Sequence, residues 1–220
     1  LGDNVFKGKL TGGITKNLGV YLNRSYRIFD DGFYSNRIVA EKVLEPLDIN
    51  AIFFIIPEFA SIEDQEKSRY FVANNIIPNS KITDIPANFI NMQWDDLKIL
   101  LDCGHTIGSH TKTHYRLSSL TRESDLKEQI IDSGDILSER LGINIDHFAY
   151  SFGDIGSFSE AALKVARKRY KFIYSGIRGD NLKNFPTNLI KRDAAAFQLK
   201  NNQYEIFSNK LLGSFLDGFA

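Results

Sequence analysis

The sequence predicts an α/β domain built on a parallel β-sheet. Short apolar runs alternate along the chain with longer amphipathic segments, which is the pattern that βα units produce. The chain has 220 residues, of which 43% are hydrophobic, so it can bury a sizeable core. We therefore expect residues 1–220 to form a single domain.

Six apolar runs are the expected strands of this sheet. They are short, as buried strands are, and most are rich in Ile, Phe and Tyr, which favour strands. The expected strands are residues 26–29, 51–56, 106–109, 148–150, 172–174 and 189–191.

Four amphipathic segments are the expected helices between these strands. In one of them, Leu97, Leu100 and Leu101 form an apolar stripe with helical spacing. The longest segment stops before Gly142, a residue type that commonly terminates helices. The expected helices are residues 36–47, 94–103, 122–141 and 159–170.

Residues 57–92 differ in pattern from the rest of the chain. They hold three of the five prolines and show little sustained periodicity, which predicts a long insertion. Connections of this length usually contribute to a site or carry small elements of their own. Two alternatives follow: a lid that contacts substrate, or a surface excursion with one short helix near residues 62–74.

Composition excludes several classes of protein. The 27 basic and 27 acidic residues give a formal net charge of zero, so no overall field attracts nucleic acid or an anionic bilayer, and only local patches could bind either one. No run of about 18 apolar residues is present that could cross a membrane. The single cysteine, Cys103, cannot form an internal disulfide, and its apolar neighbours predict a buried thiol.

The two ends of the chain give weaker indications. No charged segment followed by an apolar one is visible at the start, which favours a cytoplasmic location. The chain begins at Leu1 rather than at a methionine, so an export signal ahead of it would not be seen. The apolar stretch at residues 211–220 must be buried, either on this domain or in an oligomer.

Polar residues that can bind a metal follow two of the expected strands. Asp30 and Asp31 follow the first strand, and His110 and His114 follow the third at a spacing of about one helical turn. A turn at residues 151–153 follows the fourth strand. In a parallel barrel the C-terminal ends of all strands open onto one face, so we expect these residues to meet there.

Such a set of residues is suited to metal chemistry. Two imidazoles and one carboxylate, with positions left for water, make an open site for zinc or a similar divalent ion. A second carboxylate beside that water can act as a general base. The alternatives are an ordinary Asp-Asp-Gly turn, a histidine pair that arose by chance, and a structural domain with no site.

Three motifs resemble those of the NodB-like polysaccharide deacetylases, a family of carbohydrate esterases. IFDDGF at residues 28–33 resembles their TFDDG motif, and GHTIGSHTKTHYRLSSL at residues 104–120 resembles their histidine motif. FAYSFG at residues 148–153 resembles a variant of their third motif that is usually written FAYPFG. The resemblance spans about residues 25–192 and implies a single distorted (β/α) barrel.

The resemblance also implies roles for individual residues. Asp30 matches the catalytic base, and Thr111 matches the hydroxyl residue that steadies the histidine loop. The backbone N–H of Phe152 matches the donor to the oxyanion. The ligands of one divalent ion, zinc in the first place and cobalt or nickel as alternatives, match three residues: Asp31, His110 and His114.

The chain departs from the family pattern at three places. Ala149 stands where the family often has an arginine that orients the catalytic aspartate, and Ser151 replaces the usual proline. No Leu-x-x-His motif occurs in the C-terminal part, so the family's usual general acid has no match. Arg192, just beyond the sixth expected strand, could reach the Asp30 carboxylate, and the alternative is a solvated cation.

Several other polar and aromatic residues are candidates for structural or sugar-binding roles. His105 and His147 precede their strands, so we expect them at the opposite end of the barrel in structural roles. Tyr115 and Tyr150 are candidates for stacking on a sugar, with core packing as the alternative. Two residues in GIRGDN are further candidates for sugar contacts: Arg178 and Asp180.

The resemblance implies a metal-dependent hydrolase that removes an N-acyl group, most often acetyl, from an amino sugar. The lack of a visible export signal favours an intracellular glycan precursor used in surface polysaccharide assembly. Extracellular chitin or peptidoglycan is the alternative glycan, and a non-sugar amide is a further one. The missing arginine and histidine motivate a different interpretation, a descendant of the same fold that binds metal and sugar without turnover.

Overall fold

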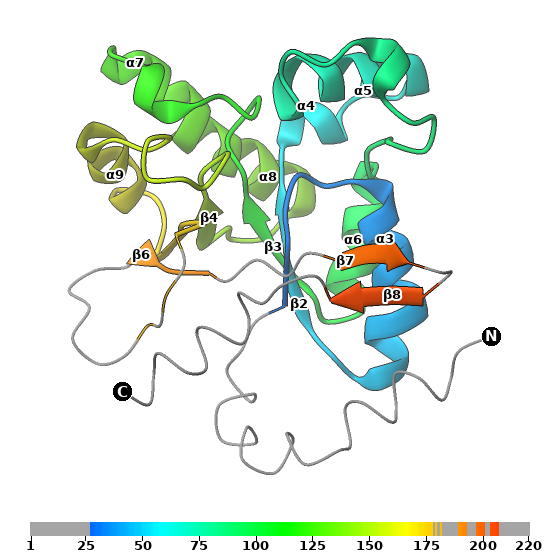
Figure 1. Ribbon diagram of the computed structural model, residues 1–220. Coiled ribbons are helices and arrows are strands. Elements are labelled where there is room, and N and C mark those ends of the chain that lie inside the picture. The colour runs from blue at the N-terminus through cyan, green and yellow to red at the C-terminus, as the bar shows by residue number, and fades with distance from the viewer. Residues whose placement is uncertain are drawn as a thin grey trace, which may run out of the picture.

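A six-stranded parallel sheet forms the centre of the protein. The computed structural model describes residues 27–177, 179, 181, 189–192, 197–200 and 203–206 (Figure 1). The strands of the sheet are β1 (Arg27–Phe29), β2 (Ala51–Ile55), β3 (Thr106–Ser109), β4 (His147–Ala149), β5 (Phe172–Tyr174) and β6 (Leu189–Ile190). They are all parallel and lie in the sheet in chain order. The predicted parallel α/β sheet is therefore confirmed, with strand ends that agree to within one residue.

The sheet is curled, so that its first and last strands approach each other at their C-terminal ends. Asp30 follows β1 directly, and Arg192 comes two residues after β6. Arg192 Nη1 lies 2.8 Å from Asp30 Oδ1. Within the described residues no ladder joins β1 to β6. The fold is thus a distorted, incompletely closed (β/α) barrel, as expected. An antiparallel pair, β7 (Phe197–Lys200) and β8 (Gln203–Ile206), follows in the chain.

Helices connect the strands and cover the outer face of the sheet (Figure 1). The four predicted helices are present, and two of them contain π-helical turns. Between β1 and β2 run α3 (Tyr34–Val39), the π-helical turn η1 (Ala40–Leu44) and the 3-10 turn η2 (Glu45–Leu47). The others are α6 (Trp94–Asp102) before β3, then α7 (Glu123–Lys127), η6 (Glu128–Asp132) and α8 (Ser133–Leu141) before β4, and α9 (Glu160–Arg167) before β5.

Local sequence explains where these helices start and stop. The Gln93 N–H donates to Asp96 Oδ2 at 2.8 Å, and the Gln93 side chain accepts from the Asp96 N–H, a reciprocal cap that begins α6. The Ser159 hydroxyl accepts from the Ala162 N–H at 3.1 Å and begins α9. Gly142 has a φ of 68° and ends α8, as its position in the sequence predicted.

The core has two layers, one on each face of the sheet. Along β2, Phe53 and Ile55 belong to the main cluster of buried residues under the helices. Ile52 and Phe54 alternate with them and belong to a second cluster on the concave face. The members of this concave layer are Ile52, Phe54, Ala149 and Tyr174, with Ile28 and Ile190 packed against them. Since β2 is buried on both faces, its sequence is apolar throughout.

Residues 57–92, the predicted insertion, connect β2 to α6 and have a small core of their own. The insertion contains α4 (Pro57–Ala60), α5 (Gln65–Phe71), the π-helical turn η3 (Val72–Ile76) and the 3-10 turn η4 (Ile82–Asp84). Its apolar cluster is Ile56, Phe59, Val72, Ala73 and Ile85, with Phe33, Ile62, Phe71, Ile76 and Phe89 packed against it. The expectation of one short helix was too simple, because the insertion buries enough apolar surface to order several turns.

Some expectations about single residues need correction or lie outside the described part. Cys103 is exposed rather than buried. It follows the last residue of α6, away from the apolar stripe that carries Leu97 and Leu100 into the core. Arg178, Asp180 and residues 211–220 lie outside the described residues, and what was expected of them stays a prediction. No helix in the described part of the chain is both long and apolar enough to cross a bilayer.

We predict that Gly108→Ala destabilises the fold. A Cβ at Gly108 would lie 2.5 Å from the Phe54 ring and 3.1 Å from the His147 carbonyl oxygen. Overpacking of this kind typically costs about 1–3 kcal/mol. Urea unfolding of Gly108→Ala should therefore show a lower midpoint than Gly156→Ala, where only a flexible Asp154 carboxylate is close. Equal stability of the two variants would contradict the proposed packing.

Candidate functional site

Three side chains predicted to share an ion converge at the C-terminal ends of the strands. Asp31 lies two residues after β1, and His110 follows β3 directly. Asp31 Oδ1 lies 3.3 Å from His110 Nε2 and 3.3 Å from His114 Nε2. The possible ligand atoms of these three residues all lie within 4.8 Å of one another. We call Asp31, His110 and His114 the acceptor cluster.

Hydrogen bonds fix the tautomer of both imidazoles. His110 Nδ1 lies 2.8 Å from the Ala149 carbonyl oxygen, and His114 Nδ1 lies 2.8 Å from the Asn75 carbonyl oxygen. A carbonyl oxygen can only accept, so each Nδ1 must donate its hydrogen. In a neutral ring Nε2 then has only a lone pair, and both lone pairs face the Asp31 carboxylate. The residues therefore fit a divalent cation, because three acceptors need a positive charge between them.

The electrostatics of the cluster also favour a positive charge beside Asp31. Burial alone would raise the pKa of Asp31, but His110 and His114, when each is protonated and donates through Nε2, outweigh it and hold the pKa well below its usual range. Burial would lower the pKa of His110, yet the Asp31 carboxylate, which accepts from the protonated Nε2, and the charge of Asp30 raise it overall. The carboxylate is thus stabilised in its ionised form.

Backbone strain is concentrated at the same place. Six described non-glycine residues have positive φ angles, and four of them lie in or beside the acceptor cluster. These are Asp31 (73°), Thr111 (63°), His114 (63°) and Phe152 (66°). Each such residue costs on the order of 1 kcal/mol and persists only where the surroundings hold it. This concentration is typical of a functional site.

Asp30 is held by an arginine from the other end of the sheet. Arg192 Nη1 donates to Asp30 Oδ1 at 2.8 Å, and Arg192 Nε donates to the Ser175 carbonyl oxygen at 2.7 Å. The guanidinium carbon also lies 5.5 Å from the centroid of the Phe54 ring. Ala149, where the family often has an arginine, is fully buried in the concave layer with Phe54. The contact expected between Arg192 and Asp30 is present, so Arg192 is not a solvated cation.

The turn after β4 brings Phe152 to the cluster. The centroids of the Phe152 and His114 rings lie 4.7 Å apart. The Arg116 guanidinium carbon also contacts Phe152 and lies 4.5 Å from the centroid of its ring. Arg116 is paired with Asp154 at 3.0 Å. The backbone N–H of Phe152 has no acceptor among the described residues.

The hydroxyls of Thr111 and Ser151 bond to each other. Thr111 Oγ1 lies 2.8 Å from Ser151 Oγ, and both residues are fully buried. This bond ties the histidine loop, residues 109–114, to the turn that carries Phe152. Serine at the family's proline position thus supplies a hydrogen bond where the ring constraint of proline is missing.

The remaining candidates lie in different surroundings. Tyr150 is 1% exposed, its ring stacks on Phe158 at 4.2 Å, and its hydroxyl donates to the Gly153 carbonyl oxygen. No face of this ring is open to a sugar, so Tyr150 has the packing role that was the alternative. Tyr115 is 48% exposed and next to His114 in the chain.

The other two histidines lie at the opposite end of the strands, as expected. His105 precedes β3, and its Nδ1 accepts from the Ala51 N–H at the start of β2. His147 is the first residue of β4, stacks on Phe172 and bonds to the Tyr174 hydroxyl. Both are therefore structural.

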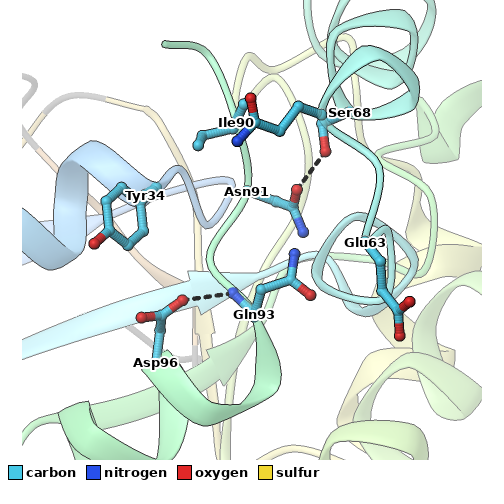
Figure 2. A pocket seen from close by; sticks show the side chains of 8 residues that line it. Tyr34, Glu63, Ser68, Ile90, Asn91, Gln93 and Asp96 are labelled. Carbon is cyan, nitrogen blue, oxygen red and sulfur yellow. Dashed lines mark hydrogen bonds between the residues drawn. The ribbon is translucent and has the colours of Figure 1, made fainter.

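A pocket of about 340 Å³ lies beside the insertion and shares no lining residue with the acceptor cluster. It is lined by Tyr34, Glu63, Gln65, Ser68, Ile90, Asn91, Gln93 and Asp96. Figure 2 shows that Asn91 bonds to Ser68 and that Gln93 bonds to Asp96. The Asn91 and Gln93 amides also donate to the Ile62 carbonyl oxygen. These hydrogen bonds of Ser68, Asn91, Gln93 and Asp96 thus fasten the insertion.

Sequence reasoning missed two residues that contact the histidine loop. Asn75 accepts from His114 through its backbone carbonyl, and Gln129 bonds to Lys112 and Thr113. No signal in the sequence marks a backbone carbonyl as a partner, because every residue has one.

Comparisons with known proteins agree with this geometry. The family model for polysaccharide deacetylase matches residues 23–170, which is more than half of the chain. The match includes Asp30, the acceptor cluster and Phe152, and it ends before Arg192. None of the curated proteins matches the sequence.

Solved structures with the same fold are similar to this chain at low sequence identity. IcaB from Ammonifex degensii is 20% identical with a TM-score of 0.58, over 76% of this chain and 65% of that one. The BpsB deacetylase domain from Bordetella bronchiseptica is 16% identical with a TM-score of 0.59, over 75% and 68%.

Streptococcus pyogenes deacetylase PplD, solved in complex with acetate, is 19% identical with a TM-score of 0.54, over 70% of this chain and 56% of that one. The chain thus spans 56% of the length of PplD and 65% of the length of IcaB. On the evidence of the family match, the chain belongs to the polysaccharide deacetylase family.

Proposed function

We propose that this protein hydrolyses an N-acyl group, acetyl in the first place, from an amino sugar in a glycan or glycan precursor. We further propose that it uses one divalent metal ion, zinc in the first place, held by the acceptor cluster. The observation that carries this proposal is the convergence of three acceptor atoms, with no hydrogen between them when both rings are neutral, next to a second carboxylate. The family match and the acetate named for the PplD structure support the choice of reaction.

The chemistry follows from the positions of this chain's own residues. A divalent ion in the cluster would supply Lewis acidity toward the acyl oxygen and toward a water molecule. Asp30 would take the proton of the attacking water, and Arg192 would keep the carboxylate in place through their 2.8 Å contact. The Phe152 N–H, which has no acceptor in the described part of the chain, would donate to the oxyanion that forms when water adds to the carbonyl carbon.

Release of the amine needs a proton on its nitrogen as the C–N bond breaks. The chain has four histidines, and the two outside the acceptor cluster lie at the opposite end of the strands. Asp30 would therefore return the proton that it took from water, or solvent would supply it. Acetate and a free amino sugar are the products.

One observation favours turnover over a descendant that only binds. Ala149 leaves β4 without an arginine that could orient Asp30. Arg192 makes the contact with Asp30 that this arginine would have made. A surface polysaccharide or its precursor is the glycan we propose, since the family is named for polysaccharide substrates.

We predict that zinc or cobalt stabilises metal-free protein, with one ion bound per chain. Free ion at 100 times its dissociation constant should add about 2.7 kcal/mol of stability. Thermal unfolding with and without the ion measures this. His110→Ala should lose the effect, and Asp95→Asn, which changes an exposed carboxylate, should keep it. The same thermal shift in His110→Ala as in the unchanged protein would argue against the site.

Asp30→Asn should abolish acetate release while the ion stays bound. Losing a general base typically lowers the rate about 10²–10⁴-fold. Acetate is measured with a panel of N-acetylated amino-sugar oligomers, and the metal content is measured on the same samples. Undiminished release by Asp30→Asn would refute the assignment. If the unchanged protein, loaded with metal, releases no acetate from any oligomer of the panel, the result would support the alternative that the protein binds metal and sugar without turnover.

Arg192→Ala should lower kcat about 10- to 100-fold at unchanged metal content, because misplacing a reacting group is costly. The variant loses the contact with Asp30 but none of the acceptor cluster. Steady-state kinetics with the most reactive acetylated substrate provide the measurement. Full activity in this variant would show that the contact has no catalytic consequence.

A further inference from the structure

Two residues bind the histidine loop with both backbone and side chain. Asn75 accepts from His114 Nδ1 through its carbonyl oxygen at 2.8 Å, and its Nδ2 donates to the Thr113 carbonyl oxygen at 2.9 Å. The carbonyl oxygen of Gln129 accepts from the Lys112 N–H at 3.0 Å. Gln129 Oε1 accepts from both the N–H and the hydroxyl of Thr113 at 3.1 Å. The loop is thus held from two sides.

Both residues lie in π-helical turns. Asn75 belongs to η3 in the insertion, and Gln129 belongs to η6 between α7 and α8. In a regular α-helix each carbonyl accepts from the N–H four residues further on. A π turn shifts this pairing by one residue, and such turns are frequent at functional sites. In this protein both turns present a carbonyl oxygen to the histidine loop.

The contacts bear directly on the strained part of the loop. His114 has a φ of 63°, so its position depends on neighbours that hold it. The Asn75 carbonyl fixes which nitrogen of His114 carries the hydrogen, and the Asn75 amide holds the preceding residue. Gln129 is buried and holds Thr113 from the other side.

The insertion is connected to the acceptor cluster through a second route. Phe33, two residues after Asp31, packs against the apolar cluster of the insertion. The Tyr34 N–H donates to the Ile90 carbonyl oxygen, and the Met92 N–H donates to the Gly32 carbonyl oxygen. The insertion therefore holds the segment after Asp31 as well as His114.

We propose that Asn75 and Gln129 are positioning residues of the metal site, and that the 57–92 insertion is part of its support. This inference rests on the proposed function, since it assumes that the acceptor cluster binds an ion. Neither residue needs to touch the ion or the substrate. Their contribution is to keep His114 Nε2 directed at Asp31.

Cobalt titration of metal-free protein tests the proposal. Four variants are compared with the unchanged chain: Asn75→Ala, Gln129→Ala, Gln129→Glu and Asn74→Ala. Cobalt affinity and the visible absorption bands of the bound ion are measured, together with the unfolding temperature of each metal-free protein. Loss of support around a ligand typically costs about 10–100-fold in affinity, so we expect about 10-fold weaker binding for Asn75→Ala and for Gln129→Ala.

The two other variants separate positioning from a general loss of stability. Asn74 is exposed, and its amide donates to the Tyr70 carbonyl of its own helical segment, so Asn74→Ala should bind cobalt as the unchanged chain does. Gln129→Glu keeps an oxygen that accepts from Thr113 and should recover most of the affinity. Altered absorption bands in the two weakened variants would show a changed coordination geometry.

The proposal is overturned if Asn75→Ala and Gln129→Ala bind cobalt as tightly as Asn74→Ala. It is also overturned if Gln129→Glu binds no better than Gln129→Ala. Unchanged protein that takes up no cobalt would overturn the proposed function and this inference together. Normal uptake by the unchanged protein and by all variants would overturn this inference alone.

Discussion

The site depends on one constraint: three acceptor atoms face each other, and the hydrogens that could relieve their repulsion are committed elsewhere. The Nδ1 hydrogens of His110 and His114 are donated to backbone carbonyls, which leaves both Nε2 lone pairs directed at the Asp31 carboxylate. Such an arrangement is costly without a cation and favourable with one. The strained backbone at His114 and Asp31 shows that the surrounding structure maintains this arrangement against its local cost.

The barrel makes this convergence possible because its parallel strands end at one face. Small residues on the concave side decide what fits there: Gly108 leaves room for the Phe54 ring, and Ala149 is buried beside it. Arg192 then reaches over Phe54 to Asp30 and joins the last strand to the first. Ala149 has no charged side chain, so the arginine that contacts Asp30 comes from the end of the last strand instead.

Much of this could be predicted from the sequence, and the rest could not for physical reasons. Periodicity predicted the strands because a buried parallel strand such as β2 must be apolar on both faces. The spacing of His110 and His114 pointed to the site because imidazole is a distinctive ligand. Asn75 and Gln129 were missed because half of their role rests on backbone carbonyls, which every residue has, and because their amide side chains belong to no recognisable motif. Tyr150 and Cys103 show that sequence neighbours do not fix burial, since one is enclosed by Phe158 and the other lies beyond the end of a helix.

X-ray absorption at the zinc edge tests the central claim most directly. Zinc-loaded protein should show two imidazole nitrogens and one carboxylate oxygen at about 2.0–2.2 Å, with the remaining positions filled by water. His114→Ala should lose one of the two imidazole contributions and keep the other. A zinc spectrum without imidazole scattering, or one that is unchanged by His114→Ala, would contradict the account.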